Sequence, residues 1–260
     1  MGQVPYFLAF AAIVALLPAC EGETPAPDRN LILLVELKTD LVPGVEFAAV
    51  RTQLFDPADR SEELTRRQVD VALGRDLTSG LRVAELGDLA TGTYLVRTTL
   101  VDLMGTEVLR RDVVVTVRET AGVTVLMTRD CVGVECPGTG SSPTETACLS
   151  GRCVEERCTP ETPEHCPVPE CSMPAECMGA VGACAEWACE DSTCLVRTDH
   201  TRCEAPTQYC DPTSGCRDVD VPSDAGAGDA SMDTGANTSM PSDILFESHA
   251  PHVTTDFVLG

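Results

Sequence analysis

The sequence predicts a mainly β protein: an antiparallel β-sandwich, then an irregular disulfide-rich region, then a disordered acidic tail. Three observations support this prediction. Apolar residues alternate with a period near two in the first half of the chain. Fourteen of the 15 cysteines fall between Cys131 and Cys216. Small residues and spaced acids without bases follow Asp218, which is typical of a flexible segment. The predicted parts are a sandwich domain at 30–128, a cysteine-rich disulfide-stapled region at 129–217, and an acidic linker with a short C-terminal segment at 218–260.

Residues 4–19 form an uncharged apolar run of 16 residues. A membrane span needs about 20 residues, so the run fits the apolar core of a secretory signal better. It ends in Leu17-Pro18-Ala19-Cys20, which resembles the lipobox of bacterial lipoproteins. Two features depart from that pattern: Pro18 replaces the usual small residue, and no basic residue precedes the run.

The lipobox resemblance implies the fate of the N-terminus. Residues 1–19 would be removed as a lipoprotein signal peptide, and Cys20 would be acylated on its sulfur and on its new amino group. Residues 20–29 would then form a polar tether. The alternative is an ordinary signal peptide followed by a stray cysteine.

The sandwich domain is predicted from short alternating runs separated by turns. The predicted strands are Leu31–Thr39, Val45–Phe55, Gln68–Leu73, Leu81–Leu86, Thr93–Asp102, Glu107–Arg118 and Val123–Thr128. Leu103-Met104-Gly105 is expected to close a hairpin, since glycine accepts a positive φ. The polar stretch Asp59–Arg67 is expected to be a long loop or a single helical turn.

Leu89-Ala-Thr-Gly-Thr-Tyr94 resembles the corner sequence of immunoglobulin-like and fibronectin-like sandwiches. In those domains a tyrosine at the start of a strand donates a hydrogen bond to the backbone a few residues upstream. The resemblance implies an immunoglobulin-like sandwich with Tyr94 as its structural corner. It departs in having Val96 where antibody domains have a cysteine. The alternative is that Tyr94 is an ordinary strand aromatic.

The clustered cysteines predict structural disulfides. They are Cys131, Cys136, Cys148, Cys153, Cys158, Cys166, Cys171, Cys177, Cys184, Cys189, Cys194, Cys203, Cys210 and Cys216. An even number in one block indicates internal pairing, with the connectivity left open. No two consecutive cysteines are separated by the two residues that are typical of a zinc site or a redox pair. His165 and His200 are solitary, so no metal site is expected.

An internal repeat is indicated within the cysteine-rich region. Ala147-Cys-x4-Cys-x4-Cys158 returns as Ala183-Cys-x4-Cys-x4-Cys194, displaced by 36 residues. Cys203, Cys210 and Cys216 would form a closing half-unit. Biased composition that imitates a repeat is the alternative.

The tail offers no established site. Asp218 and Asp220 alternate as in calcium loops but lack the rest of such a loop. His249 and His252, separated by a proline, make no helical zinc face. A linker normally joins two folded parts, which leaves open whether the chain is a truncated member of a longer architecture. The net charge of −23 argues against nucleic acid as a partner.

Taken together, these parts resemble cysteine-rich bacterial surface lipoproteins, most of which have no known function. The resemblance implies an extracytoplasmic protein, lipid-anchored to the bacterial cell envelope at the outer membrane or cell surface. Its expected partners are the membrane, through lipid at Cys20, and a protein or glycan ligand. No catalytic constellation or cofactor motif is present in the sequence, so a binding, adhesion or structural role is expected. The alternative is a disulfide-stapled protease inhibitor or a secreted redox or enzymatic module.

Overall fold

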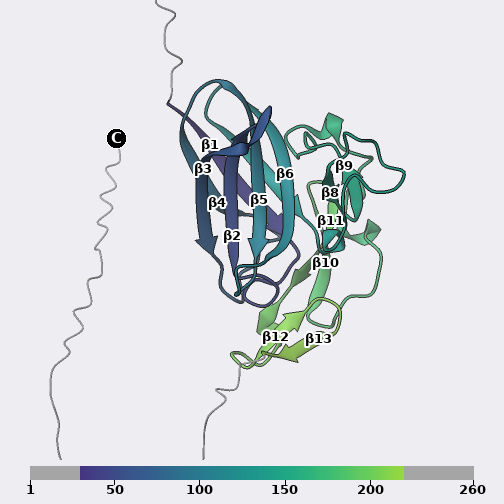
Figure 1. Ribbon diagram of the computed structural model, residues 1–260. Helices are drawn as coiled ribbons and strands as arrows, with labels where there is room; N and C mark the ends of the chain where they lie inside the picture. The colour runs from purple at the N-terminus through teal and green to yellow at the C-terminus, as the bar shows by residue number, and fades with distance from the viewer. Residues whose placement is uncertain (1–29, 220–260) are drawn as a thin grey trace, which may run out of the picture. The chain divides into compact units, whose positions relative to one another are not determined.

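A computed structural model describes residues 30–219, which belong to one compact unit (Figure 1). Strands, turns and short 3-10 helices account for this part of the chain, and no α-helix occurs in it. The mainly β class is therefore confirmed. The predictions for the signal peptide, for Cys20, for the tether and for the tail from Asp220 onward lie outside the described residues.

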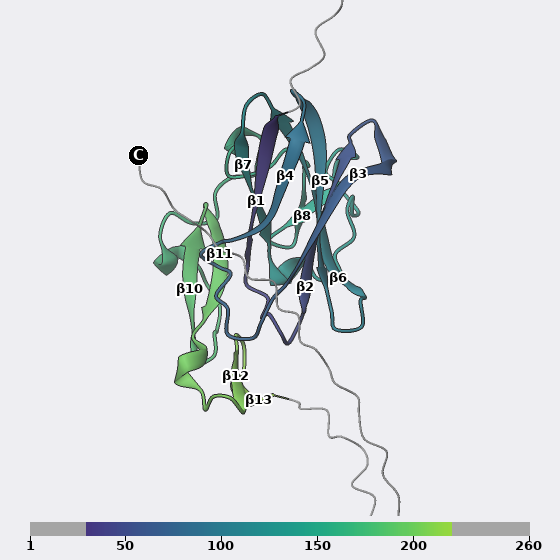
Figure 2. The same cartoon turned by 90° about the vertical axis from the view of Figure 1, so that its left-hand side faces the viewer.

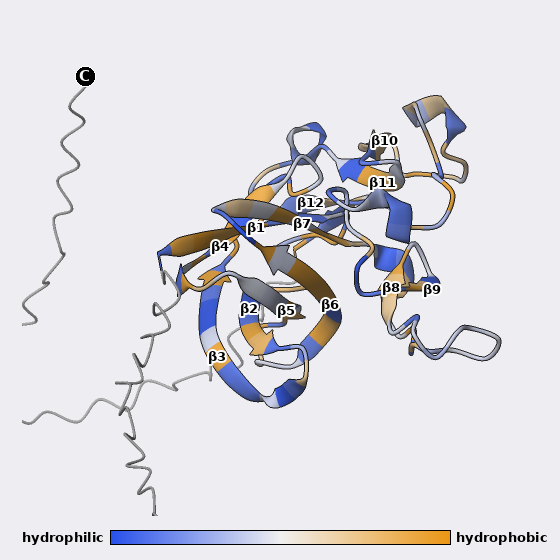
Figure 3. Ribbon diagram, turned by 90° about the horizontal axis from the view of Figure 1, so that it is seen from above, coloured by the Kyte–Doolittle hydropathy of each residue, from blue (hydrophilic) through white to orange (hydrophobic). Residues whose placement is uncertain are grey.

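Seven strands form two sheets that pack face to face (Figure 3). They are β1 Leu31–Thr39, β2 Ala49–Asp56, β3 Asp59–Asp70, β4 Leu81–Leu89, β5 Gly92–Val101, β6 Glu107–Val117 and β7 Ala121–Met127. One sheet has the order β4-β1-β7 and the other β3-β2-β5-β6. Every pair of neighbours is antiparallel except β1 and β7, which run parallel. The predicted sandwich is confirmed, whereas its strand order differs from the ABED and CFG sheets of immunoglobulin constant domains.

The core lies between the two sheets and is built from alternating residues of each strand. Leu33, Val35 and Leu37 of β1 are at most 1% exposed, and Val96 and Leu100 of β5 are fully buried opposite them. Each such side chain contributes about 1.5–3 kcal/mol when it leaves water. Apolar packing therefore stabilises the sandwich, as its lack of cysteines before Cys131 requires.

The prediction for the stretch Asp59–Arg67 is wrong, because these residues belong to strand β3. β3 is an edge strand with β2 as its neighbour in the sheet. Nearly all of its side chains are exposed on both faces, so the alternation that reveals a half-buried strand is missing. Charged residues on such an edge also discourage pairing with another chain.

Tyr94 closes the corner expected of it, since its Oη donates to the Ala90 carbonyl oxygen at 2.8 Å. Replacing Tyr94 by phenylalanine is expected to lower the free energy of unfolding by about 1 kcal/mol, because this bond is lost while the ring stays. Urea titration checks the value. An unchanged midpoint at constant slope would show that the hydroxyl contributes nothing to the corner.

The cysteine-rich region is more regular than predicted, since it contains three β-hairpins. They are β8 Ala147–Leu149 with β9 Arg152–Val154, β10 Ala185–Glu190 with β11 Thr193–Thr198, and β12 Gln208–Asp211 with β13 Gly215–Asp218. A short 3-10 helix, Arg129–Cys131, precedes the first hairpin, and three more lie between the hairpins: Pro163–His165, Pro174–Glu176 and His200–Arg202. The first two hairpins turn at Ser150-Gly151 and Asp191-Ser192, all four residues having positive φ. Such turns match the right-handed twist of paired strands.

All fourteen cysteines of the region form disulfides. The pairs are Cys131–Cys148, Cys136–Cys153, Cys158–Cys166, Cys171–Cys189, Cys177–Cys194, Cys184–Cys210 and Cys203–Cys216. We call residues 131–216, with these bridges, the disulfide array.

The array contains a repeat, but its displacement differs from the predicted 36 residues. In each hairpin two cysteines face each other across the strands, as Cys148 faces Cys153 and Cys189 faces Cys194. Each then bridges to a cysteine upstream. Cys148 therefore corresponds to Cys189, a displacement of 41 residues. The sequence shows two Cys-x4-Cys intervals in series in each copy, and spacing alone does not reveal which one forms the hairpin.

The array packs against the β6 and β7 side of the sandwich (Figure 3). Cys131 and Cys148 belong to the sandwich core cluster, and Leu126 of β7 packs with Leu149 and Leu195 of the array. The predicted boundary between residues 128 and 129 marks a change of element type within one packed unit.

Polar contacts reinforce this packing. The Val114 backbone N–H donates to the Glu156 carbonyl oxygen at 2.8 Å, and Arg60 donates two hydrogen bonds, of 2.7 and 2.8 Å, to the Glu156 carboxylate. Arg129, just before the array, pairs with Glu46. Beside it, burial raises the pKa of Asp40 to about 6, although this carboxylate accepts a bond from the Arg129 backbone N–H.

Candidate functional site

A cavity of about 350 Å³ lies where the disulfide array meets the sandwich. Small-molecule sites in proteins usually measure about 300–1,000 Å³, so the volume suits a small ligand. β6 and β7 supply one side, and the array supplies the rest through its first hairpin, the segment 158–170 and the turn at 191–193. We call it the junction cavity.

Most of the lining is apolar and rigid. It includes Leu126, Leu149, Val168, Pro160, Pro163, Pro167 and Pro169. The ring of each proline fixes φ, and the Cys158–Cys166 disulfide closes the loop that carries two of them. These residues lose little conformational entropy on ligand binding, so the cavity is preorganised for an apolar body.

One charged side chain is buried in this lining. Arg111 of β6 is only 3% exposed. Its Nη2 donates to the Cys158 carbonyl oxygen at 2.8 Å and its Nη1 donates to the Leu126 carbonyl oxygen. Its Nε has no hydrogen-bond partner, and no carboxylate in residues 30–219 forms an ion pair with it. Burial lowers the pKa of Arg111 to about 10, so the guanidinium still carries its charge at neutral pH.

The other charged residues of the lining differ in whether they have partners. Asp191 pairs with Lys38 at 2.8 Å, and Glu170 accepts hydrogen bonds from the Ser150 hydroxyl and the Cys194 backbone N–H. Arg152 is exposed and forms no ion pair within the described part of the chain. Both acids of the lining therefore have partners in the protein, whereas neither of its arginines forms an ion pair with a carboxylate of the described residues.

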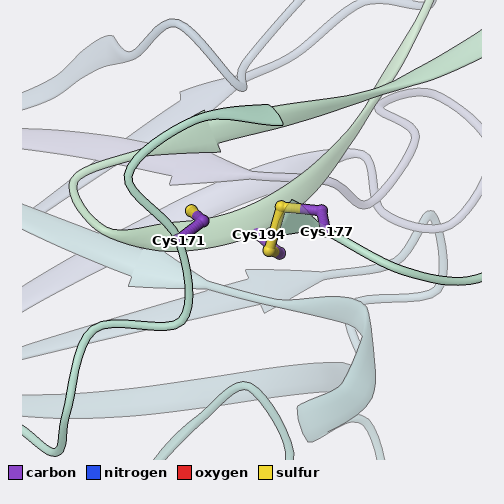
Figure 4. Close-up of side chains that lie close together, drawn as sticks. All are labelled: Cys171, Cys177 and Cys194. Atoms are coloured by element: carbon purple, nitrogen blue, oxygen red, sulfur yellow. A yellow bond between two sulfur atoms is a disulfide. The ribbon is translucent and has the colours of Figure 1, made fainter. Parts of the chain in front are cut away.

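The residues singled out in the sequence lie elsewhere or have structural roles. The sulfur of Cys171 lies close to the Cys177–Cys194 disulfide (Figure 4), and the three sulfur atoms fall within 4.8 Å of one another. They belong to two disulfides and offer no thiolate to a metal. His200 Nδ1 accepts a hydrogen bond from the Cys210 backbone N–H at 3.0 Å, and burial lowers the pKa of this histidine.

Arg111 was missed at the sequence level although a signal for it existed. In β6 the inward positions alternate, and Leu109 and Val113 both belong to the core. Arg111 lies between them, two residues from each, and so shares their face of the strand. A charged residue on an apolar face was therefore predictable. A cation at such a position needs either an anion or carbonyl oxygens.

Comparisons with protein-family models, curated proteins and solved structures find no match to this chain. Within residues 30–219 there is no helix that is both long and apolar enough to cross a membrane.

Proposed function

We propose that the protein is a binding protein held at a bacterial cell envelope by lipid on Cys20, without a catalytic role. Seven disulfides favour an oxidising environment and so support a location outside the cytoplasm. The lipobox at Leu17–Cys20 supports the anchor. The junction cavity carries the binding role, because it is preorganised, apolar and lined by a buried cation without a carboxylate partner.

The orientation of the sandwich suits a tether at its N-terminal side. Residue 30 precedes β1, and the antiparallel register places the β5–β6 loop at the opposite end of the sheets (Figure 2). That loop exposes Leu103 and Met104 by 85% and 89%. In a protein anchored through Cys20, this loop would lie at the end of the sandwich farther from the tether.

Replacing Cys20 by serine is expected to move the protein from the detergent-extractable membrane fraction to the soluble fraction. Two or three acyl chains, at about 0.8 kcal/mol for each buried methylene, otherwise hold it firmly. Fractionation of the bacterial host followed by intact-mass measurement checks this, with Thr24→Ser as the matched control. Retention of the Cys20→Ser variant in the membrane fraction would contradict the anchor.

A second candidate function is inhibition of a protease, and one observation favours it. The segment Pro167-Val168-Pro169-Glu170 lies between the bridged Cys166 and Cys171, and Val168 is 84% exposed. A rigid exposed loop of this kind suits a protease cleft. A panel of serine proteases tests it: inhibition by the native protein that Val168→Asp abolishes would support this function, and no inhibition would exclude those enzymes.

A further inference from the structure

We infer that the junction cavity binds a small organic carboxylate, whose anionic group contacts Arg111 and whose apolar body packs against the prolines. The inference rests on the proposed binding role and adds the class of ligand. It follows from the hydrogen-bonding capacity of Arg111, from the charges around the cavity and from the apolar lining.

Arg111 has more donors than the protein uses. A guanidinium has five N–H groups in a planar fork, and two of them donate to the carbonyl oxygens of Leu126 and Cys158. Nε has no partner although it is buried. A buried charge without a counter-ion costs several kcal/mol. Nη1 and Nη2 each keep a second N–H that neither carbonyl uses. A carboxylate can accept both in parallel and supplies the missing charge.

The charges around the cavity permit an anion, unlike most of the protein surface. The chain has 41 acidic and 18 basic residues, so its surface generally repels anions. The acids of the lining, Glu170 and Asp191, are already bound to protein groups. Arg152 remains available at the exposed part of the lining. The two arginines of the lining balance its two acids, so an anion would meet less repulsion here than on the acidic surface elsewhere.

The apolar lining favours a carboxylate over an inorganic anion. Leu126, Leu149 and Val168, together with the prolines, offer no donors to a hydrated phosphate or sulfate. Stripping water from such an ion without replacing its hydrogen bonds is unfavourable. A ligand with one carboxylate and an aliphatic or aromatic body satisfies both parts of the lining.

Isothermal titration of the full chain, purified with its disulfides intact, tests the inference. The probes are 3-phenylpropionate and octanoate, the matched alcohols 3-phenylpropanol and octanol, and inorganic sulfate. The carboxylates are expected to bind at least about tenfold more tightly than the alcohols and sulfate, a difference of about 1.4 kcal/mol. Arg111→Met, which keeps much of the side-chain volume, is expected to remove this preference.

Two further variants keep the test decisive if Arg111→Met folds poorly. Arg152→Gln changes an exposed side chain and is expected to weaken carboxylate binding severalfold without altering the melting temperature. Arg118→Gln removes an exposed arginine outside the lining and is expected to change nothing.

Three results would overturn the inference: alcohols or sulfate that bind as tightly as the carboxylates, full carboxylate affinity in a folded Arg111→Met or Arg152→Gln variant, or no saturable carboxylate binding at millimolar concentration. None of these results bears on the anchor, which the Cys20→Ser fractionation tests separately.

Discussion

Replacing both Cys131 and Cys148 by alanine is expected to lower the free energy of unfolding of residues 30–219 by about 3–5 kcal/mol. The two cysteines are 1% and 8% exposed and belong to the same core cluster as the sandwich strands. Their removal releases a covalent loop and also leaves space in the apolar core. The sandwich should therefore lose stability together with the array, as measured by urea unfolding followed by circular dichroism.

The Cys203–Cys216 pair provides a matched control for this experiment. It joins residues 13 apart in sequence, against 17 for Cys131–Cys148, so the loop-entropy contributions differ by only about 0.2 kcal/mol. Cys203 and Cys216 lie outside the sandwich core cluster. Replacing this pair by alanine should lower the free energy of unfolding by less, and should mainly loosen the β12–β13 hairpin. Equal losses in both double variants would show that packing of Cys131 and Cys148 adds nothing to stability.

Replacing Leu195 by alanine is expected to lower the free energy of unfolding by about 2–5 kcal/mol, the usual range for a buried leucine. Leu195 is fully buried in the cluster that joins the array to Leu126 of β7. Since this cluster spans the contact between the two regions, the sandwich and the array should unfold in one transition at a lower urea concentration.

Met178→Ala is the control for the leucine substitution. Met178 is 88% exposed in the same array, and changes at such positions are usually within about 0.5 kcal/mol of neutral. If Leu195→Ala instead produced two separate transitions, with the sandwich transition unchanged, the two regions would be independent in stability despite their contact.

Local patterns were sufficient to predict much of the sandwich. The bounds of β1 agree with the prediction, because alternation over nine residues reports a strand buried on one face. The partners of β1 were not predictable in the same way. Its parallel pairing with β7 joins residues almost ninety positions apart, and no local pattern encodes that choice. Most of β3 escaped detection because neither of its faces is buried, and only its end, Gln68–Asp70, falls within a predicted strand.

The array and the candidate site were predictable to different degrees. The even number of cysteines indicated internal bridges, but seven pairs allow many connectivities, and only the hairpin contacts select among them. The junction cavity depends on contacts between β6 and residues far along the chain, so the sequence alone did not reveal it. The parity of Arg111 within β6 was the one accessible signal.

The disulfide connectivity has a mechanical consequence. Within residues 131–216 the bridges overlap into two locked blocks, 131–153 and 171–216, with a small loop at 158–166 between them. A stretching force between residues 30 and 219 would load the hydrogen bonds of β1, which lies between two neighbours, in shear. Once the sandwich yielded, most of the remaining chain could not lengthen, since each bridge bypasses the residues that it encloses. Under tension the sandwich would unfold and extend, while the disulfide array would keep nearly its original length.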